Sequence, residues 1–463
     1  MDATSLLASE ALNSSTSTPT EVYKKAPRRW LVIFAFSLMN AMNAYLWISF
    51  APIANVAASR FNVSVNSINW LSLAYMLLYL PGSIVSIYVT ERYGMKNLLH
   101  AAAITNCLAA IIRWLAVFGG GNFGFPIVMI GQCLAALAQP AYINAPARIS
   151  SDWFGKGEQA IATTVAAMSN VVGNALGSSL PSVFVSVPSD IDNTLLGAAI
   201  VSFLFLLVSL YLIRDDAPDE PVSEAAVNRQ LARKALCDES GSIQSPVTEA
   251  FRAVRADFSA LLSNRNFWSL LVGFGVFSAA FNALLTLISQ LLLPCGYGND
   301  TAGFSGAALL GAGLFGAGLS GVLLDKTQAF LTLLRAFLGL ELIAMMFLLS
   351  SLRPGAEVTL VISFGVTGFF LMPLLPLALE NAAECTFPCS EDNSAALLLG
   401  LGNYLGMIAI FALEALMLYP SVVSCSTVFT PSAGFLFGII LFSTLMLVMF
   451  KKDYRRSQAK EGR

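Results

Sequence analysis

The feature that most constrains this 463-residue sequence is the recurrence of long apolar stretches along its whole length. Each stretch has about 20 residues, enough for an α-helix to cross the ~30 Å hydrocarbon core of a bilayer. Only 12% of the residues are charged, against about 25% in a soluble domain. The sequence therefore predicts an all-α membrane protein with twelve transmembrane helices, near residues 30–51, 65–89, 97–118, 124–149, 159–187, 193–213, 267–293, 302–324, 328–350, 357–380, 394–419 and 431–450.

Basic residues are distributed unevenly among the connections between these helices. If the N-terminus is cytoplasmic, that side receives most of the 26 Lys and Arg residues, while the opposite connections contain only Arg60 and Arg353. The positive-inside rule therefore predicts that both termini lie in the cytoplasm. This topology places two N-x-S/T sequons, at Asn62 and Asn299, on the outside, where we expect glycosylation.

Two short features bear on the compartment in which the protein works. We expect no cleavable signal peptide, because the first apolar stretch is too long and lacks a small-residue cleavage site. Asp2 followed by Leu6 and Leu7 resembles an acidic dileucine sorting signal, so we expect either the plasma membrane or an endolysosomal membrane. Cys295 and Cys425 fall in outer connections and could pair, which spacing alone does not establish.

A charged segment in the middle of the chain separates the apolar stretches into two sets of six. The predicted parts are a disordered cytoplasmic tail (1–29), a first six-helix bundle (30–213), a cytoplasmic linker (214–266), a second six-helix bundle (267–450) and a basic cytoplasmic tail (451–463).

The two halves share a sequence repeat. Four residues of the first half recur 233 positions later, so that Phe154, Glu158, Asn170 and Gly173 match Phe387, Glu391, Asn403 and Gly406. Such a repeat predicts two bundles related by an axis along the membrane normal, the architecture of the major facilitator superfamily. We therefore expect Asn170 and Asn403 to face each other across a central cavity.

An acidic–basic pair follows the second helix of each half, Glu91–Arg92 in the first and Asp325–Lys326 in the second. These pairs resemble the cytoplasmic loop signature of the superfamily, although the accompanying run of glycine and basic residues is incomplete. We interpret them as elements of a cytoplasmic gate. A gate in both halves favours a transporter over the alternative, a membrane receptor or sensor that binds a solute without moving it.

Polar side chains recur within helices that should line a central cavity. Amides also hydrogen-bond between transmembrane helices, so packing explains any single one of them equally well. The whole set is better explained by a solute cavity, because polar groups in a membrane turn toward protein or water. The predicted substrate-binding residues are Asn40, Asn43, Trp47, Gln139, Tyr142, Asn170, Asn174, Asn282, Asn403 and Tyr404.

The charges indicate what kind of solute such a cavity would accept. The predicted cavity helices carry almost no ionisable residue at mid-depth, whereas Arg113, Arg335 and Glu341 lie on peripheral helices and are expected to stabilise the fold. We therefore expect a neutral solute or a soft cation held by aromatic faces and amides. His100, the only histidine, lies near a helix end, which leaves no cavity histidine to ligate haem iron.

Several segments resemble solute carrier family 49, the feline leukaemia virus subgroup C receptor-related transporters. They are "RRWLVIFAFSLMNAMNAYLWISFAPIANV", "INWLSLAYM", "QCLAALAQPAYINAPARISSDWF", "AAMSNVVG", "GFSGAALLGAGLFGAGLSGVLLDKTQAF" and "LENAAECTFP". Within the family the chain is most similar to the member 3 type, also described as the major facilitator superfamily domain-containing 7 type. The resemblance implies transport of a small organic solute, with haem, choline or ethanolamine, and a vitamin B6-like vitamer as the family's range.

The resemblance also implies roles for individual residues. The choline-transporting relatives cover the quaternary ammonium with a tryptophan in the first helix, and Trp47 matches it. This chain has Val171 and Asn403 where those relatives have glutamines in the fifth and eleventh helices. A tyrosine of their seventh helix is replaced here by Asn282.

These observations favour a transporter and argue against catalysis. No nucleophile, base or metal-ligating cluster lies within a plausible site, so we expect no enzyme activity. We also expect no cofactor, no bound metal and no nucleic-acid partner. The expected partners are a small-molecule substrate and the lipid bilayer, with the protein as a monomer.

Overall fold

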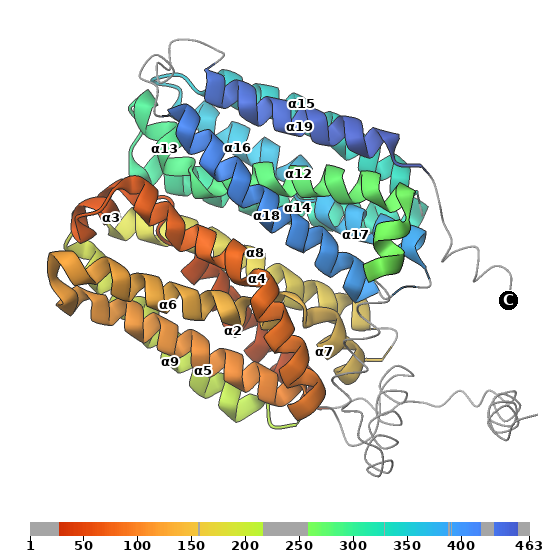
Figure 1. Ribbon diagram of the computed structural model, residues 1–463, viewed down its shortest axis with the longest axis horizontal. Coiled ribbons are helices and arrows are strands. Elements are labelled where there is room, and N and C mark those ends of the chain that lie inside the picture. Colours follow the sequence, from red (N-terminus) through yellow and green to blue (C-terminus); the bar gives the residue numbers. More distant parts are fainter. Residues whose placement is uncertain are drawn as a thin grey trace, which may run out of the picture.

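The computed structural model describes residues 27–155, 158–215, 258–327, 329–387, 389, 391–417 and 430–451. Most of the predicted linker, nearly all of both predicted tails, and Cys425 lie outside these residues. Within them the structure is helical throughout and contains no β-strand. Cys295 is disulfide-bonded. The helices form two bundles side by side, one from each half of the chain (Figure 1).

The first bundle contains the helices before the predicted linker. They are α2 (Arg29–Ile48), α3 (Ala54–Phe61), α4 (Val65–Tyr93), α5 (Met95–Leu115), α6 (Gly120–Ile143), α7 (Pro146–Trp153), α8 (Gln159–Phe184) and α9 (Asp190–Leu212). The second bundle contains α12 (Arg265–Thr286), α13 (Ile288–Leu292), α14 (Asn299–Thr327), α15 (Phe330–Ser351), α16 (Glu357–Leu371), α17 (Leu374–Thr386), α18 (Glu391–Met417) and α19 (Pro431–Met449).

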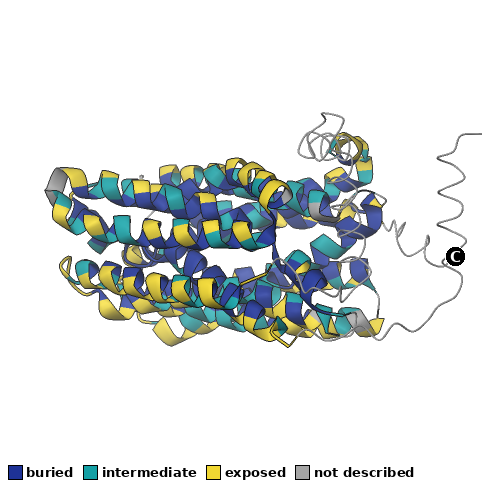
Figure 2. Ribbon diagram, turned by 90° about the horizontal axis from the view of Figure 1, so that it is seen from below, coloured by how far each residue is buried: buried dark blue, intermediate teal, exposed yellow. Residues whose placement is uncertain are grey.

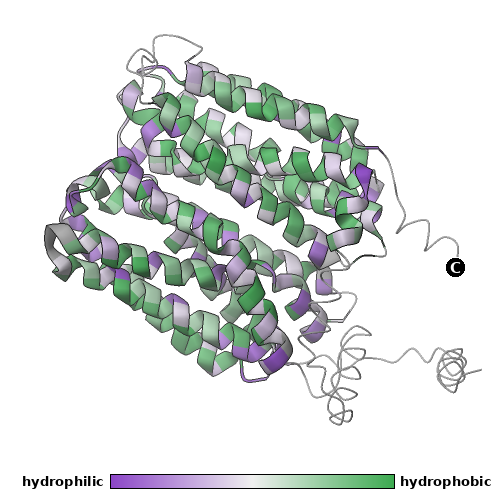
Figure 3. Ribbon diagram, in the orientation of Figure 1, coloured by the Kyte–Doolittle hydropathy of each residue, from purple (hydrophilic) through white to green (hydrophobic). Residues whose placement is uncertain are grey.

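Eleven helical stretches among the described residues are long and apolar enough to cross a membrane. The remaining predicted span is α8, which has 26 residues and no charge but is more polar, with Asn170 and Asn174 in its sequence. Hydrophobic residues follow the helices along their length, and hydrophilic residues gather toward their ends (Figure 3). Exposed residues lie on the outer faces of the helices and buried ones on the inner faces (Figure 2).

Two of the predicted spans are divided near prolines, and a third ends three residues earlier than predicted. The span predicted over 30–51 ends at Ile48, and five residues that include Pro52 separate it from α3. The predicted span 124–149 is divided before Pro146, and the predicted span 357–380 is divided at Met372 and Pro373. Proline has no backbone N–H and disfavours the helical conformation in the residue before it, so each break coincides with a residue that disfavours a continuous helix.

Glycines allow the corresponding helix pairs of the two bundles to approach closely. In α8, a Cβ atom on Gly173 would overlap the backbone of Ala41 in α2. In α18, a Cβ atom on Gly406 would lie 3.1 Å from Nδ2 of Asn282 in α12. Small residues let transmembrane helices pack at short distances. The two glycines that share the sequence offset therefore occupy equivalent packing positions.

Arg113 is a buried cation that forms hydrogen bonds with the C-terminal end of α2. Its Nη1 donates to the backbone oxygen of Leu46 over 3.0 Å, and its Nη2 donates to Oγ of Ser49 over 2.8 Å. The guanidinium carbon also lies 4.8 Å from the centre of the Phe50 ring. A cation near the C-terminal end of a helix interacts favourably with its dipole. These contacts fit the structural role expected from the sequence.

The other two charged residues of the peripheral helices differ in their contacts. Arg335 donates through Nη2 to the backbone oxygens of Val448 and Phe450, each over 2.9 Å, and so joins α15 to the end of α19. Glu341 is fully buried, and neither of its carboxyl oxygens has a hydrogen-bond partner among the described residues. Neither residue contributes to the lining of the central cavity described below.

Both predicted glycosylation sequons lie at the end of the molecule where α3 and α13 are found (Figure 1). Asn62 is exposed and caps α3 with a left-handed backbone conformation, φ 52°. Asn299 begins α14 and is half-buried, and the Thr301 hydroxyl of its sequon donates to Oε1 of Glu357 over 2.6 Å. Asn62 is therefore the more accessible acceptor in the folded protein.

We expect the protein expressed in mammalian cells to carry an N-linked glycan on Asn62 or Asn299, because the charge distribution places this end outside the cytoplasm. The measurement is the electrophoretic mobility shift produced by peptide N-glycosidase. The shift should disappear in the double variant Asn62→Gln/Asn299→Gln. A shift of undiminished size in that variant would contradict the predicted topology.

Candidate functional site

A cavity of about 300 Å³ lies between the two bundles. The first bundle contributes residues of α2, α4, α6, α7 and α8 to its wall, and the second contributes residues of α12, α14, α16, α17 and α18. Its volume is at the lower end of the range for small-molecule sites. No residue of this lining is charged. The cavity therefore suits a small solute that needs no ion pair.

Most of the predicted substrate-binding residues reach this cavity. They come from three helices of the first bundle and two of the second, and the cavity-lining members are Asn40, Trp47, Gln139, Tyr142, Asn170, Asn174, Asn282 and Asn403. Asn170 and Asn403 line it from α8 and α18, one from each bundle. Val171 lines it as well.

Asn43 and Tyr404 are not part of the cavity lining. The Nδ2 of Asn43 donates to Oδ1 of Asn106 over 3.0 Å and to the backbone oxygen of Ala135 over 2.9 Å, so its amide faces α5 and α6 inside the first bundle. On a helix, Asn43 lies about 60° from Asn40 whereas Trp47 lies about 20° from it, since each residue advances by ~100°. Tyr404 follows Asn403 by one residue and is turned away from the cavity for the same reason.

Several cavity amides are joined in a network that also holds α2 against α8. Asn170 donates through Nδ2 to Oδ1 of Asn40 over 3.0 Å, and Asn174 donates through Nδ2 to Oδ1 of Asn170 over 3.2 Å. Asn40 in turn donates through Nδ2 to the backbone oxygen of Ala166 over 3.0 Å and to Oγ of Ser169 over 2.9 Å. Helix packing therefore accounts for much of the hydrogen bonding of Asn40 and Asn170.

Four buried polar atoms on cavity-lining residues have no hydrogen-bond partner among the described residues. They are Nε1 of Trp47, Oε1 of Gln139, the hydroxyl of Tyr142 and Oδ1 of Asn174. A buried polar group without a partner costs about 1–3 kcal/mol, so such groups are rare unless they serve a purpose. Together they offer hydrogen-bond donors and acceptors to a solute, all from the first bundle.

Aromatic rings cover both sides of the cavity. Trp47, Tyr75, Tyr79 and Tyr142 come from the first bundle, and Phe274, Phe277 and Phe281 come from α12 of the second. The residues predicted from the sequence do not include Tyr75, Tyr79 or the three phenylalanines. The signal that could have identified them is their spacing of three, four or seven residues, which aligns side chains on one helical face.

Hydrogen bonds between the two bundles close the end of the molecule near α3 and α13. Asn69 of α4 donates through Nδ2 to Oε1 of Glu414 in α18, and Gln290 of α13 donates through Nε2 to Oδ1 of Asn69 over 2.8 Å. Ser178 of α8 donates through Oγ to the backbone oxygen of Gly303 in α14 over 3.3 Å. Each of these hydrogen bonds joins residues that are far apart in the sequence. They therefore form only when the two bundles pack together.

The predicted gate residues lie at the C-terminal ends of α4 and α14, at the end of the molecule farthest from α3 and α13. Arg92 and Lys326 are exposed, and the Arg92 guanidinium carbon lies 5.9 Å from the centre of the Tyr93 ring. The side chains of Glu91 and Asp325 are outside the described part of the structure. Their role in a gate remains a prediction.

Comparison with known proteins agrees with this architecture. The family model of the major facilitator superfamily matches residues 31–409. The chain is 30% identical over 447 residues to the choline/ethanolamine transporter FLVCR1 of Felis catus, covering 94% of this chain and 75% of the relative. It is 29% identical over 443 residues to solute carrier family 49 member A3 of Danio rerio, covering 94% of this chain and 89% of the relative.

Solved structures of transporters share the fold. A D-xylose–proton symporter superposes with a TM-score of 0.65 at 13% sequence identity, over 92% of this chain and 98% of that one. A bacterial homologue of the human lysosomal transporter Spinster, in an inward-facing and unoccupied conformation, superposes with a TM-score of 0.57 at 17% identity, over 94% of this chain and 98% of that one.

The two helical bundles around a central cavity, together with the match to the major facilitator superfamily, define a multi-pass membrane transporter, which confirms the fold class expected from the sequence. The chain belongs to the major facilitator superfamily and, within it, to solute carrier family 49.

Proposed function

We propose that this protein is an alternating-access transporter of a small organic amine of the choline or ethanolamine type. The observation that carries the proposal is the composition of the cavity, which combines aromatic ring faces and amides with no charged residue in its lining. Ring faces attract an alkylammonium by about 0.5–2 kcal/mol per contact, more when the site excludes water. Relatives at 28–30% identity are named choline/ethanolamine transporters, which supports the same substrate class.

Individual residues have distinct roles in this proposal. Trp47 presents its indole to the ammonium, and the unpartnered oxygens of Gln139 and Asn174 accept hydrogen bonds from an amine or hydroxyl. Asn403 and Asn282 supply amides from the second bundle. Val171 supplies an apolar contact, so ring faces contribute more to recognition here than side-chain hydrogen bonds from the middle of α8.

The same lining disfavours haem as the principal substrate. A porphyrin with two carboxylates needs cationic partners, and the lining contains neither arginine nor lysine. It also contains no histidine, and the only histidine of the sequence is His100. A neutral B6-like vitamer needs neither a cationic partner nor a histidine ligand. It would, however, gain nothing from the electrostatic attraction between the aromatic rings and a cation.

Transport would follow from rocking of the two bundles around the fixed cavity. The hydrogen bonds of Asn69 and Ser178 with the second bundle close one end, so this conformation admits solute from the other end. Opening the closed end requires these bonds to break while the opposite ends of α4 and α14 approach. The pairs Glu91–Arg92 and Asp325–Lys326 are then placed to hold the cytoplasmic end.

The test is uptake into proteoliposomes that contain the purified protein. We expect labelled choline or ethanolamine to enter faster than into empty vesicles, and a labelled porphyrin and pyridoxine to enter no faster. Saturable binding of an amine without uptake would favour a receptor or sensor. Uptake of porphyrin or pyridoxine but not of amines would overturn the proposed substrate class.

A further inference from the structure

A second hollow lies on the outer side of the first bundle and shares no lining residue with the central cavity. Its volume is about 590 Å³, and it runs between α2, α8 and α9. We call it the lateral groove. Its walls include Ala41 and Tyr45 of α2, Leu176 and Leu180 of α8, and Gly197 and Val201 of α9.

The lateral groove opens toward the lipid rather than toward the partner bundle. Its α8 wall includes Leu176, Leu180 and Phe184, which are 44%, 39% and 65% exposed, and its α9 wall includes Val201, which is 39% exposed. These helices have the length of membrane spans, so the medium around these side chains is hydrocarbon. A Cβ atom on Gly197 would meet nothing within 4 Å, which shows that the groove reaches the α9 backbone.

One end of the lateral groove is polar and acidic. Asp190, Asn193 and Thr194 lie there, at the start of α9, and Asp190 is the only charged residue of the lining. The Oδ2 of Asp190 accepts hydrogen bonds from the backbone N–H groups of Ser186 and Val187, each over 3.0 Å, which fixes the carboxylate in place. The start of α9 lies at the α3–α13 end of the molecule, so this carboxylate is at the depth of lipid headgroups.

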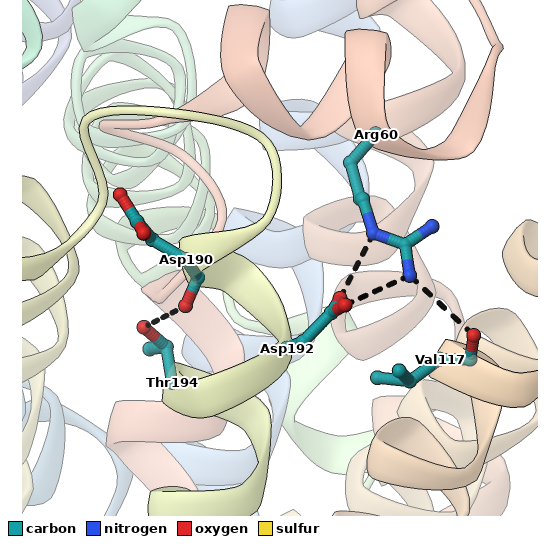
Figure 4. Close-up of polar contacts among 5 residues, drawn as sticks. All are labelled: Arg60, Val117, Asp190, Asp192 and Thr194. Atoms are coloured by element: carbon teal, nitrogen blue, oxygen red, sulfur yellow. Dashed lines mark hydrogen bonds and ion pairs between the residues drawn. The ribbon is translucent and has the colours of Figure 1, made fainter.

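The second acidic residue at the start of α9, Asp192, does not face the lateral groove. Asp192 points to the other side of α9, where its carboxylate accepts from Nε and Nη2 of Arg60 over 2.8 and 3.1 Å (Figure 4). The Arg60 guanidinium is thereby directed to Asp192 and the backbone oxygen of Val117, away from Asp190 (Figure 4). Arg60 compensates the charge of Asp192, whereas Asp190 has no cationic partner among the described residues and lies beside an apolar groove.

We propose that the lateral groove binds a membrane phospholipid whose headgroup ends in an ammonium. One acyl chain lies along the apolar walls between α8 and α9, and the ammonium of a choline or ethanolamine headgroup meets the Asp190 carboxylate. Charge complementarity selects this headgroup, because the lining offers one anion and no cation. Phosphatidylglycerol has no ammonium to meet Asp190, and phosphatidylserine adds a carboxylate that would meet no cation in the lining. This proposal concerns a bound lipid and is independent of what the central cavity transports.

The groove is tested by filling it. Gly197→Leu places a side chain where the acyl chain would lie, and Gly339→Leu is the matched control, since Gly339 is also exposed, lies on a span of the second bundle and has nothing within 4 Å of its Cβ position. Native mass spectrometry of protein purified with its lipids should show phosphatidylcholine or phosphatidylethanolamine on the control. We expect the amount of phospholipid bound to Gly197→Leu to be at least about tenfold lower than the amount bound to the control. Equal retention in the two variants would overturn the groove as a lipid site.

The headgroup is tested by competition in nanodiscs that contain equal amounts of phosphatidylcholine and phosphatidylglycerol. The native protein and the control Asp300→Asn, an exposed acid at the start of α14, should retain phosphatidylcholine in preference. Asp190→Asn should lower that preference by about fivefold, while total lipid retained changes less. A native preference for phosphatidylglycerol, or the same preference with and without the Asp190 carboxylate, would overturn the assignment of the headgroup.

Discussion

Gly303→Leu should hold the two bundles apart at the α3–α13 end and reduce transport about 5- to 150-fold. Gly303 lies where α14 crosses α8, and even a Cβ atom there would overlap the side chain of Ser182 and lie 2.8 Å from the backbone oxygen of Ser178. Overpacking costs about 1–3 kcal/mol, which shifts a two-state equilibrium by the factor given. Because this contact joins the bundles rather than helices within one bundle, the cost falls on the closed conformation.

The matched control for that variant is Gly318→Leu. Gly318 lies on the same helix and is exposed, and its Cβ position has nothing within 4 Å. Opening can be measured in nanodiscs by the rate at which a water-soluble maleimide labels Ser72→Cys, since Ser72 lies one turn from Asn69 on α4 and is 2% exposed in the closed state. Labelling should be fast with Gly303→Leu and slow with Gly318→Leu. Equal rates would show that this contact does not control opening.

Much of the fold follows from properties that the sequence displays directly. Apolar length identifies the spans, and even the more polar α8 is recognisable because its 26 residues contain no charge. The helix breaks before Pro146 and at Pro373 were predictable from proline chemistry, but apolar length alone passed over them. Pro81 and Pro181 remain inside α4 and α8, so proline by itself does not say whether a helix ends or continues. Packing against neighbouring helices decides between the two.

The candidate site was partly predictable, because polar residues in lipid must face protein or water. That rule does not distinguish a cavity from a bundle interior, which is why Asn43 was expected at the cavity and instead bonds to Asn106 and Ala135. Aromatic residues such as Phe277 were not predicted, because an aromatic side chain on a transmembrane helix can face lipid as well as a cavity. The bond between Asn69 and Glu414 joins residues 345 positions apart, and the sequence repeat gives no sign of it.

Trp47 gives the most specific test of how the central cavity recognises its solute. Its side chain is 8% exposed, lines the cavity and leaves Nε1 without a partner among the described residues. If the indole covers an ammonium, an aromatic replacement keeps part of the attraction and an aliphatic one loses it. The loss of about 0.5–2 kcal/mol corresponds to a factor of about 2 to 30 in transport efficiency.

We therefore expect uptake of labelled choline at equal protein levels to decrease in the order native, Trp47→Phe, Trp47→Leu. Trp47→Ala is less informative, because an empty core position alone costs about 3–5 kcal/mol and lowers the amount of folded protein. Trp153→Phe and Trp153→Leu are the controls, since Trp153 is 6% exposed but lies in α7 outside the cavity lining. These replacements should change the protein yield. The KM for choline should be the same for Trp153→Phe and Trp153→Leu. If Trp47→Leu transports as well as Trp47→Phe, the ring face contributes nothing to recognition, and Trp47 serves as an apolar wall of the cavity.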